Sequence, residues 1–135
     1  MIKTKNPELQ YRPLWLTIGY ILVALVLYLS LTSSPVEIDL DIDYQDKFFH
    51  VVAYFTLMFW FAQIYHEKFW RNTYAVLFVL MGVGLEYLQS FDPERYYEFA
   101  DMVANTAGVV LGLLLSLTSA KNILLHIEDR FKRRS

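Results

Sequence analysis

Four long apolar runs dominate the sequence, and short polar segments separate them. Pro13–Leu31 and Phe48–Tyr65 contain no Asp, Glu, Lys or Arg over 19 and 18 residues. Tyr74–Phe91 is an 18-residue run interrupted by Glu86, and Met102–Thr118 is 17 residues without a charge. A helix needs about 17 to 25 predominantly apolar residues to cross a bilayer. The pattern therefore predicts an all-α, polytopic membrane protein with four transmembrane helices over these ranges.

A soluble four-helix bundle is the main alternative for such a pattern. Each helix of a soluble bundle shows a polar face to water. The first run has no polar stripe, and 56% of the whole chain is hydrophobic while 19% is charged. Outside the four runs, only three short connections and two tails remain, residues 1–12 and the basic C-terminal tail, residues 119–135. We therefore expect residues 1–135 to form a single membrane domain.

The charges alternate in sign along the chain. Residues 1–12, 66–73 and 119–135 have net charges of +2, +1 and +3, whereas residues 32–47 and 92–101 have −4 and −3. Ten of the 12 Lys and Arg residues lie in the three basic segments. Because Lys and Arg are retained on the cytoplasmic side during insertion, both termini and the middle loop are predicted to be cytoplasmic. The two acidic loops then face outward.

Composition removes several function classes. The chain has no cysteine, which excludes disulfides, thiolate metal sites and cysteine nucleophiles. A formal net charge of −2 gives no general attraction to nucleic acid, so no nucleic-acid partner is expected. The sequence has no HExxH, P-loop, GxGxxG or G-x-S-x-G motif, and we expect neither a metal nor a cofactor.

Polar side chains gather at the predicted outer ends of the last three helices. Charged groups are costly inside a membrane and usually face protein or a water-filled cavity. Around each of these helix ends the polar residues recur three or four positions apart, so they share a helix face. We therefore expect them to converge on one outward-facing, ligand-binding pocket. Its predicted members are Asp46, Lys47, His50, Tyr54, Glu86, Gln89, Arg95, Asp101 and Asn105.

Each of these residues also has a structural interpretation. His50 could be a hydrogen-bonded histidine near an interface, and Asn105 could bridge helices. Asp101 could cap the helix that follows it, because carboxylates are favoured at helix N-termini. Arg95 could pair with the acidic residues of its own loop. Glu86 is the hardest to explain in this way, because a carboxylate inside a membrane helix must be neutral, paired or hydrated.

Small residues line one face of the fourth run. Ala104, Gly108 and Gly112 form a small-xxx-small-xxx-small row, which permits close contact between helices. Gly82 and Gly84 could do the same for the third run. The row would also allow the lipid-embedded chain to form an oligomer.

The basic tail has an amphipathic pattern. Leu124, Ile127 and Phe131 fall on one helix face, and three basic residues, 132–134, follow them. Two interpretations stay open: the tail lies along the inner leaflet as an amphipathic helix, or it only fixes the topology of the chain.

The polar positions form two spaced motifs. They are Asp46-Lys47-x2-His50-x3-Tyr54 and Glu86-x2-Gln89-x5-Arg95-x5-Asp101-x3-Asn105-x2-Gly108-x3-Gly112. Together they resemble the VanZ-like family of small bacterial membrane proteins over residues 46–112, half of the chain. The resemblance implies a multi-pass protein of the bacterial cytoplasmic (inner) membrane, in a family named after a member linked to resistance to the glycopeptide teicoplanin. It does not supply a reaction.

Three functions fit these observations. The first is a cell-envelope accessory whose outer pocket binds an anionic lipid or a lipid-linked precursor, with Lys47 and Arg95 holding phosphate. The second is a membrane enzyme acting on a phosphorylated lipid headgroup, with His50, Glu86 and Asp101 as catalytic candidates. The third is an ion-pair network that locks the helices together and binds no ligand. A small transporter is disfavoured, because the inner halves of the four runs lack ionisable residues.

Overall fold

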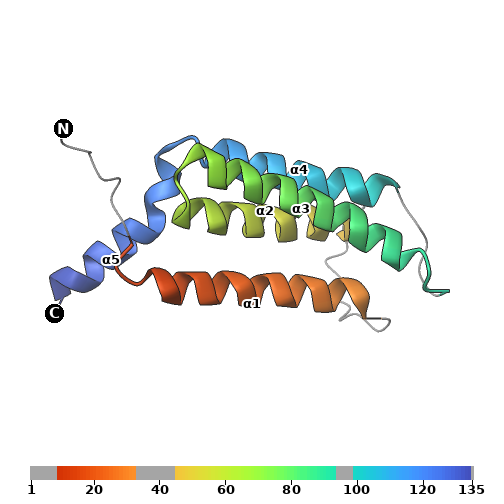
Figure 1. The fold of residues 1–135 in the computed structure, drawn as a ribbon, viewed down its shortest axis with the longest axis horizontal. Helices are drawn as coiled ribbons and strands as arrows, with labels where there is room; N and C mark the ends of the chain where they lie inside the picture. Colours follow the sequence, from red (N-terminus) through yellow and green to blue (C-terminus); the bar gives the residue numbers. More distant parts are fainter. Residues whose placement is uncertain (1–8, 33–44, 94–98, 135) are drawn as a thin grey trace.

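The computed structural model describes residues 9–32, 45–93 and 99–134, and over these residues the chain is helical. Four long helices lie side by side along the long axis of the molecule, and a short 3-10 helix leads to a fifth α-helix (Figure 1). This confirms the all-α prediction. The helices are α1 (Arg12–Leu31), α2 (Gln45–Ile64), α3 (Lys68–Gln89), α4 (Phe99–Leu115), η1 (Ser119–Asn122) and α5 (Ile123–Arg134).

Two of these helices, α1 and α2, are each long and apolar enough to cross a membrane. A third candidate span arises only if α4 and the segment Ser119–Arg134, which is bent by 81° relative to α4, are taken as one unit. By itself α4 has 17 residues. α3 is 22 residues long, but it includes Lys68, Arg71 and Glu86, which lower its mean hydropathy. The described chain therefore has two to three candidate spans by length and composition.

The helices extend past the charges that bounded the apolar runs. α2 begins at Gln45 and α3 at Lys68, earlier than the runs that predicted them. Asp46 and Asp101 lie in the first turns of α2 and α4. A carboxylate in the first turn interacts favourably with the helix dipole, so an acidic residue does not end the helix there.

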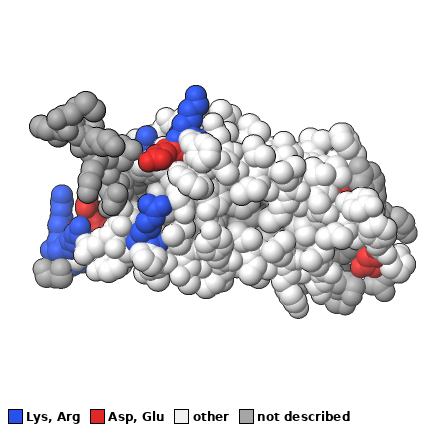
Figure 2. Space-filling model, viewed as in Figure 1, with Lys and Arg blue, Asp and Glu red and all other residues white. Residues whose placement is uncertain are grey.

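The chain alternates direction from α1 to α4, so the starts of α2 and α4 lie together (Figure 1). We call this the cluster end. The start of α1 and the whole of α5 lie at the opposite end, which we call the α5 end. One face of the molecule shows charged side chains towards the two ends and an uncharged surface between them (Figure 2). Large apolar side chains are exposed along α1, α3 and α4, as expected for helices that contact lipid.

Among the described residues, the most extensive helix contact joins α2 and α4. A Cβ atom added at Gly108 would lie 2.4 Å from the carbonyl oxygen of Val51, and one at Gly112 would lie 2.9 Å from Met58 Cβ. These two glycines therefore allow the α2 and α4 backbones to touch. Ala104, in the same row, is also buried.

This contact corrects the oligomer prediction. The row formed by Ala104, Gly108 and Gly112 is buried against α2 of the same chain, so it is not open to a second copy. In α3, Gly82 is also used internally, because an added Cβ would lie 3.0 Å from Asn105 Cβ. Gly84 has nothing within 4 Å of the corresponding position, so it makes no close helix contact.

At the α5 end, the carboxylate of Glu128 caps α1. It accepts hydrogen bonds from the backbone N–H groups of Gln10 and Tyr11 (2.6 and 2.7 Å) and from the indole N–H of Trp15 (2.7 Å). No side chain of the helix itself caps α1 at its N-cap residue, Tyr11. N–H groups at the start of a helix have no partner within the helix and favour negative charge. Glu128 is 3% exposed. Its hydrogen bonds join α5 to α1.

The same end of the molecule holds a second buried polar contact. The side chain of Gln63, near the end of α2, donates to the carbonyl of Ala120 (2.6 Å) and accepts from the N–H of Leu124 (3.2 Å). Leu124 is buried with Leu9 and Ile64. Gln63 therefore satisfies backbone groups at the bend between α4 and α5.

The Glu128 cap predicts an acid-dependent loss of stability. Burial raises the pKa of this carboxyl, but hydrogen bonds from Trp15, Tyr11 and Gln10 outweigh it, so the pKa lies below the ordinary value of 4.5. A lowered folded-state pKa stabilises the fold above the unfolded pKa, and this stabilisation is lost as the pH falls through the folded value. At neutral pH, Glu128→Gln is expected to lower the unfolding free energy by about 2 kcal/mol.

Thermal unfolding of the wild type and Glu128→Gln in detergent, at neutral and acid pH, checks this prediction. The difference between the two proteins should shrink as the pH falls below 4.5. Asp129→Asn is the matched control, since Asp129 is exposed on the same helix. A wild type and a Glu128→Gln variant of equal stability at neutral pH would show that the cap does not hold α1.

Candidate functional site

Five of the predicted site residues lie together at the cluster end. Asp46, Lys47 and His50 come from the first two turns of α2, and Asp101 and Asn105 from the first two turns of α4. They meet because α2 and α4 run in the same direction in close contact, which brings their N-terminal turns to one level. We call these five residues the polar cluster.

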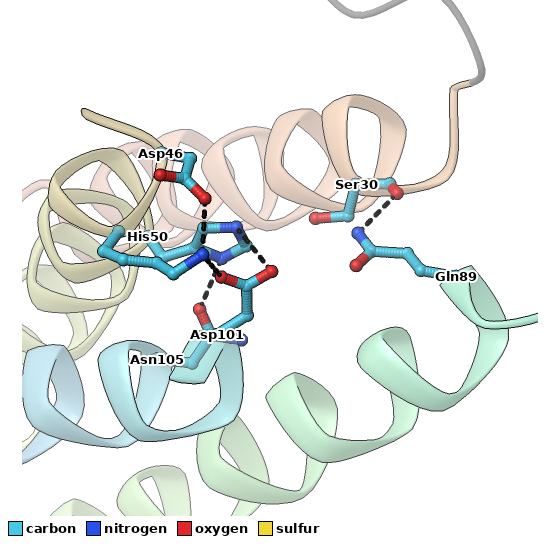
Figure 3. Close-up of polar contacts among 7 residues, drawn as sticks. Ser30, Asp46, His50, Gln89, Asp101 and Asn105 are labelled. Carbon is cyan, nitrogen blue, oxygen red and sulfur yellow. Dashed lines mark hydrogen bonds and ion pairs between the residues drawn. The ribbon is translucent and has the colours of Figure 1, made fainter. Parts of the chain in front are cut away.

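Lys47 is held between two carboxylates. Its Nζ lies 2.5 Å from Asp46 Oδ2 and 2.9 Å from Asp101 Oδ1 (Figure 3). The contact with Asp101 is an ion pair whose angles do not make a hydrogen bond, whereas the contact with Asp46 is both an ion pair and a hydrogen bond. Asp101 is buried, whereas the Asp46 side chain is 60% exposed. The lysine is therefore anchored from the interior by Asp101 and from the rim by Asp46.

His50 is positioned by α4. Its Nδ1–H donates to Asn105 Oδ1 at 2.7 Å, and its Nε2 lies 3.9 Å from Asp101 Oδ2 (Figure 3). The hydrogen bond to Asn105 fixes the orientation of the ring, and the second nitrogen faces a carboxylate. Asn105 is 3% exposed, so the amide that holds His50 belongs to the protein interior.

Glu86 and Tyr54 lie in the buried layer next to the polar cluster. A Cβ atom added at Gly82, one turn before Glu86 on α3, would lie 3.0 Å from Asn105 Cβ and 3.4 Å from Tyr54 Cε1. Because α3 and α4 run in opposite directions, Glu86 lies near the level of Asp101. Glu86 is 1% exposed. The buried hydroxyl of Tyr54 is within electrostatic reach of Glu86 and has no hydrogen-bond partner among the described residues.

Gln89 makes its hydrogen bond to a different part of the molecule. The side chain of Gln89 donates to the carbonyl of Ser30 at 2.7 Å and ties the end of α3 to the end of α1 (Figure 3). Its i, i+3 spacing from Glu86 placed it near the same face, but the neighbouring helix it reaches is α1. Arg95 lies outside the described residues.

The structure also changes the interpretation of Asp101. Because α4 begins at Phe99, Asp101 lies inside the first turn and is not the residue that precedes the helix. Its carboxylate still benefits from the helix dipole, but both of its oxygens face cations or potential cations of α2. Asp101 is therefore the link between α4 and α2 in the polar cluster.

In the polar cluster, Lys47 and His50 lie nearer the surface than Asp101, and Asp46 lies at the rim. The side chains of Lys47 and His50 are 21% and 25% exposed, whereas that of Asp101 is 12% exposed. Within the described residues, no group of three His, Asp or Glu side chains is placed to hold a metal ion. The arrangement can present an ammonium and an imidazole to a polar group that arrives from the end of the bundle.

An all-helical bundle with apolar spans and a polar cluster at one end defines a multi-pass type of membrane protein. The family model described as VanZ/LLP1 matches residues 10–122, and the chain belongs to this family. This confirms the resemblance carried by the two motifs.

One curated relative is the uncharacterized protein C11E3.10 of Schizosaccharomyces pombe. It is 32% identical over 115 residues, which cover 82% of this chain and 64% of the yeast protein. The chain thus spans a little under two thirds of that relative. Because the relative is fungal, it does not carry the expected bacterial location. No solved structure matches the chain.

Proposed function

We propose that this chain is an accessory protein of the bacterial cell envelope that binds the phosphorylated head of an anionic lipid or lipid-linked precursor. It is a single membrane domain that crosses the inner membrane four times, with α1 to α4 as the spans. Both termini lie in the cytoplasm, and the polar cluster opens outward. Binding of such a precursor would connect the protein to glycopeptide, including teicoplanin, susceptibility.

The topology is supported by the placement of charge. Lys68 and Arg71, at the start of α3, lie at the α5 end together with the basic residues of α5. Asp46 and Asp101 lie at the cluster end. Retention of Lys and Arg on the cytoplasmic side then places the α5 end inside and the cluster end outside.

The main support for the proposed ligand is the position of Lys47. Its side chain is partly exposed, and its amine is held by Asp46, whose side chain is mostly in solvent. An exposed ion pair contributes about 0 to 1 kcal/mol, so Asp46 can be displaced from the amine at small cost. A phosphate that replaced it would meet Lys47 with His50 beside it, and Asp101 would keep the lysine in place.

The proposal predicts that lipid stabilisation depends on Lys47. A short-chain polyprenyl phosphate at about 100 times its Kd should stabilise the wild type by about 2.7 kcal/mol. Lys47→Met should lose most of this gain, whereas Lys68→Met, an exposed cation at the other end, should keep it. Thermal unfolding of the three purified proteins with and without the lipid is the measurement. If the lipid stabilised Lys47→Met as much as the wild type, Lys47 would not be part of a phosphate site.

A structural role for the polar cluster is the second candidate. It is favoured because Lys47, His50, Asp101 and Asn105 all find partners within the chain. In that case Lys47→Met should unfold at a lower temperature than the wild type, and the lipid should shift neither protein. The lipid-dependent difference therefore separates the two candidates.

A further inference from the structure

Helix α5 has a docked half, which contains Leu124 and Glu128, and an exposed half, residues 129–134. Leu124 and Glu128 are buried: Leu124 packs with Leu9 and Ile64, and Glu128 is hydrogen-bonded to the start of α1. Phe131 lies further along the same face, seven residues after Leu124, yet it is 63% exposed. The apolar face that docks α5 thus continues beyond the helices it docks on.

The charged side chains of the exposed half of α5 are predominantly basic. Arg130, Lys132, Arg133 and Arg134 are all exposed, and Asp129 is the exposed acid among the described residues of α5. Glu128, the other acid of the helix, is buried and bound to α1. Figure 2 shows the resulting concentration of Lys and Arg side chains at this end of the molecule.

The direction of α5 fits a membrane surface. The segment Ser119–Arg134 is bent by 81° from α4. If α4 crosses the membrane, as proposed above, α5 therefore runs close to the membrane plane. Its Leu124 face is turned towards the bundle, which is the side on which the bilayer lies. Phe131 is then carried past the edge of the protein on the lipid side of the helix.

We propose that α5 is an anionic-lipid-binding helix, which rests on the bilayer surface at the α5 end with Phe131 inserted between headgroups and its basic side chains at the phosphates. An exposed aromatic residue on the membrane side and a surplus of Lys and Arg are what an interfacial helix uses to bind anionic lipid. The partner is the bilayer surface itself, because charge and apolar contact are offered together along one short helix.

This binding would act on α1. Glu128 holds the start of α1 through three hydrogen bonds, whereas only 6% of the most apolar stretch of α1 is buried inside the protein. A lipid surface that fixes α5 therefore also fixes the position at which α1 enters the membrane. The inference depends on α4 crossing the membrane and does not depend on the ligand of the polar cluster.

Single-cysteine labelling tests the proposal, and the chain suits it because it has no native cysteine. Phe131→Cys and His126→Cys carry an environment-sensitive fluorophore in the full-length protein. His126 is also exposed but lies on the side of α5 opposite Leu124. The proteins are placed in nanodiscs of phosphatidylcholine alone or of phosphatidylcholine with phosphatidylglycerol. The expected result is a blue shift at position 131 that requires phosphatidylglycerol and is absent at position 126.

Charge variants complete the test. Each Lys or Arg near an anionic surface contributes about fivefold to binding, so Arg133→Gln with Arg134→Gln should abolish the shift at position 131, as should high salt. Lys68→Gln removes an exposed cation outside α5 and should leave the shift unchanged. Because all these positions are exposed, the variants are expected to keep the fold, which thermal unfolding checks.

Two results would overturn the proposal in different ways. A water-like signal at position 131 in both kinds of nanodisc would show that α5 does not bind lipid, while the proposed ligand at the cluster end would be unaffected. A blue shift at both positions would place α5 inside the bilayer or against another protein, and would contradict the orientation of α4 as well.

Discussion

Replacing Gly108 by alanine is expected to destabilise the protein more than any other single methyl group added to its glycines. The new Cβ would lie 2.4 Å from the backbone oxygen of Val51 and 2.9 Å from the backbone nitrogen of Phe55. Neither atom can move without moving α2, so the helices must separate. Overpacking of a core costs about 1 to 3 kcal/mol and sometimes more, and we expect at least about 3 kcal/mol here.

Gly84→Ala is the matched control. It adds the same methyl group to a long helix, but nothing lies within 4 Å of its position. Alanine favours a helix over glycine by about 1 kcal/mol, so this variant should be as stable as the wild type or more stable. Thermal unfolding in detergent compares the two variants. If Gly108→Ala were as stable as Gly84→Ala, the close α2–α4 contact would not exist.

Removing the carboxylate of Asp101 is the second change with a large expected effect. In Asp101→Ala, Lys47 loses its buried carboxylate partner, and the second nitrogen of His50 loses the carboxylate that it faces. Loss of one member of a buried ion pair costs about 3 to 5 kcal/mol, because the other charge remains in a poorly solvated place. Since the Lys47 side chain is 21% exposed, we expect the lower end of that range, about 3 kcal/mol.

A double-mutant cycle measures this coupling directly. In Lys47→Met with Asp101→Leu both charges are replaced by apolar groups, and stability should return towards that of the wild type. Asp129→Ala, an exposed carboxylate on α5, is the control and should change little. If the effects of the two single changes simply add in the double variant, Lys47 and Asp101 are not coupled.

Much of the fold could be predicted from the sequence because long apolar runs with few charges admit only helices in a membrane. The helix ends were less predictable. Asp46 and Lys68 precede the apolar runs but are helical, because a polar side chain in the first turn of a helix can stay in contact with solvent. The structure gives two to three candidate spans where the runs predicted four, since α3 is too polar and α4 too short by itself.

The polar cluster was partly predictable for a similar reason. Residues spaced three or four apart share a helix face, and helices joined by short connections bring their ends together, so Lys47, His50 and Asp101 could be expected to meet. Spacing does not reveal which neighbouring helix a face reaches. For that reason Gln89 was assigned to the pocket, whereas it binds the carbonyl of Ser30. No local pattern marks Glu128 as the cap of α1.

The Glu128 cap has a consequence for the order in which the protein is completed. Its hydrogen bonds join residues that are 113 to 118 positions apart in the chain. During synthesis α1 is therefore made long before the carboxylate that satisfies its N-terminal N–H groups. The start of α1 is completed only when α5 has been translated, so a truncation within α5 would be felt at the start of α1.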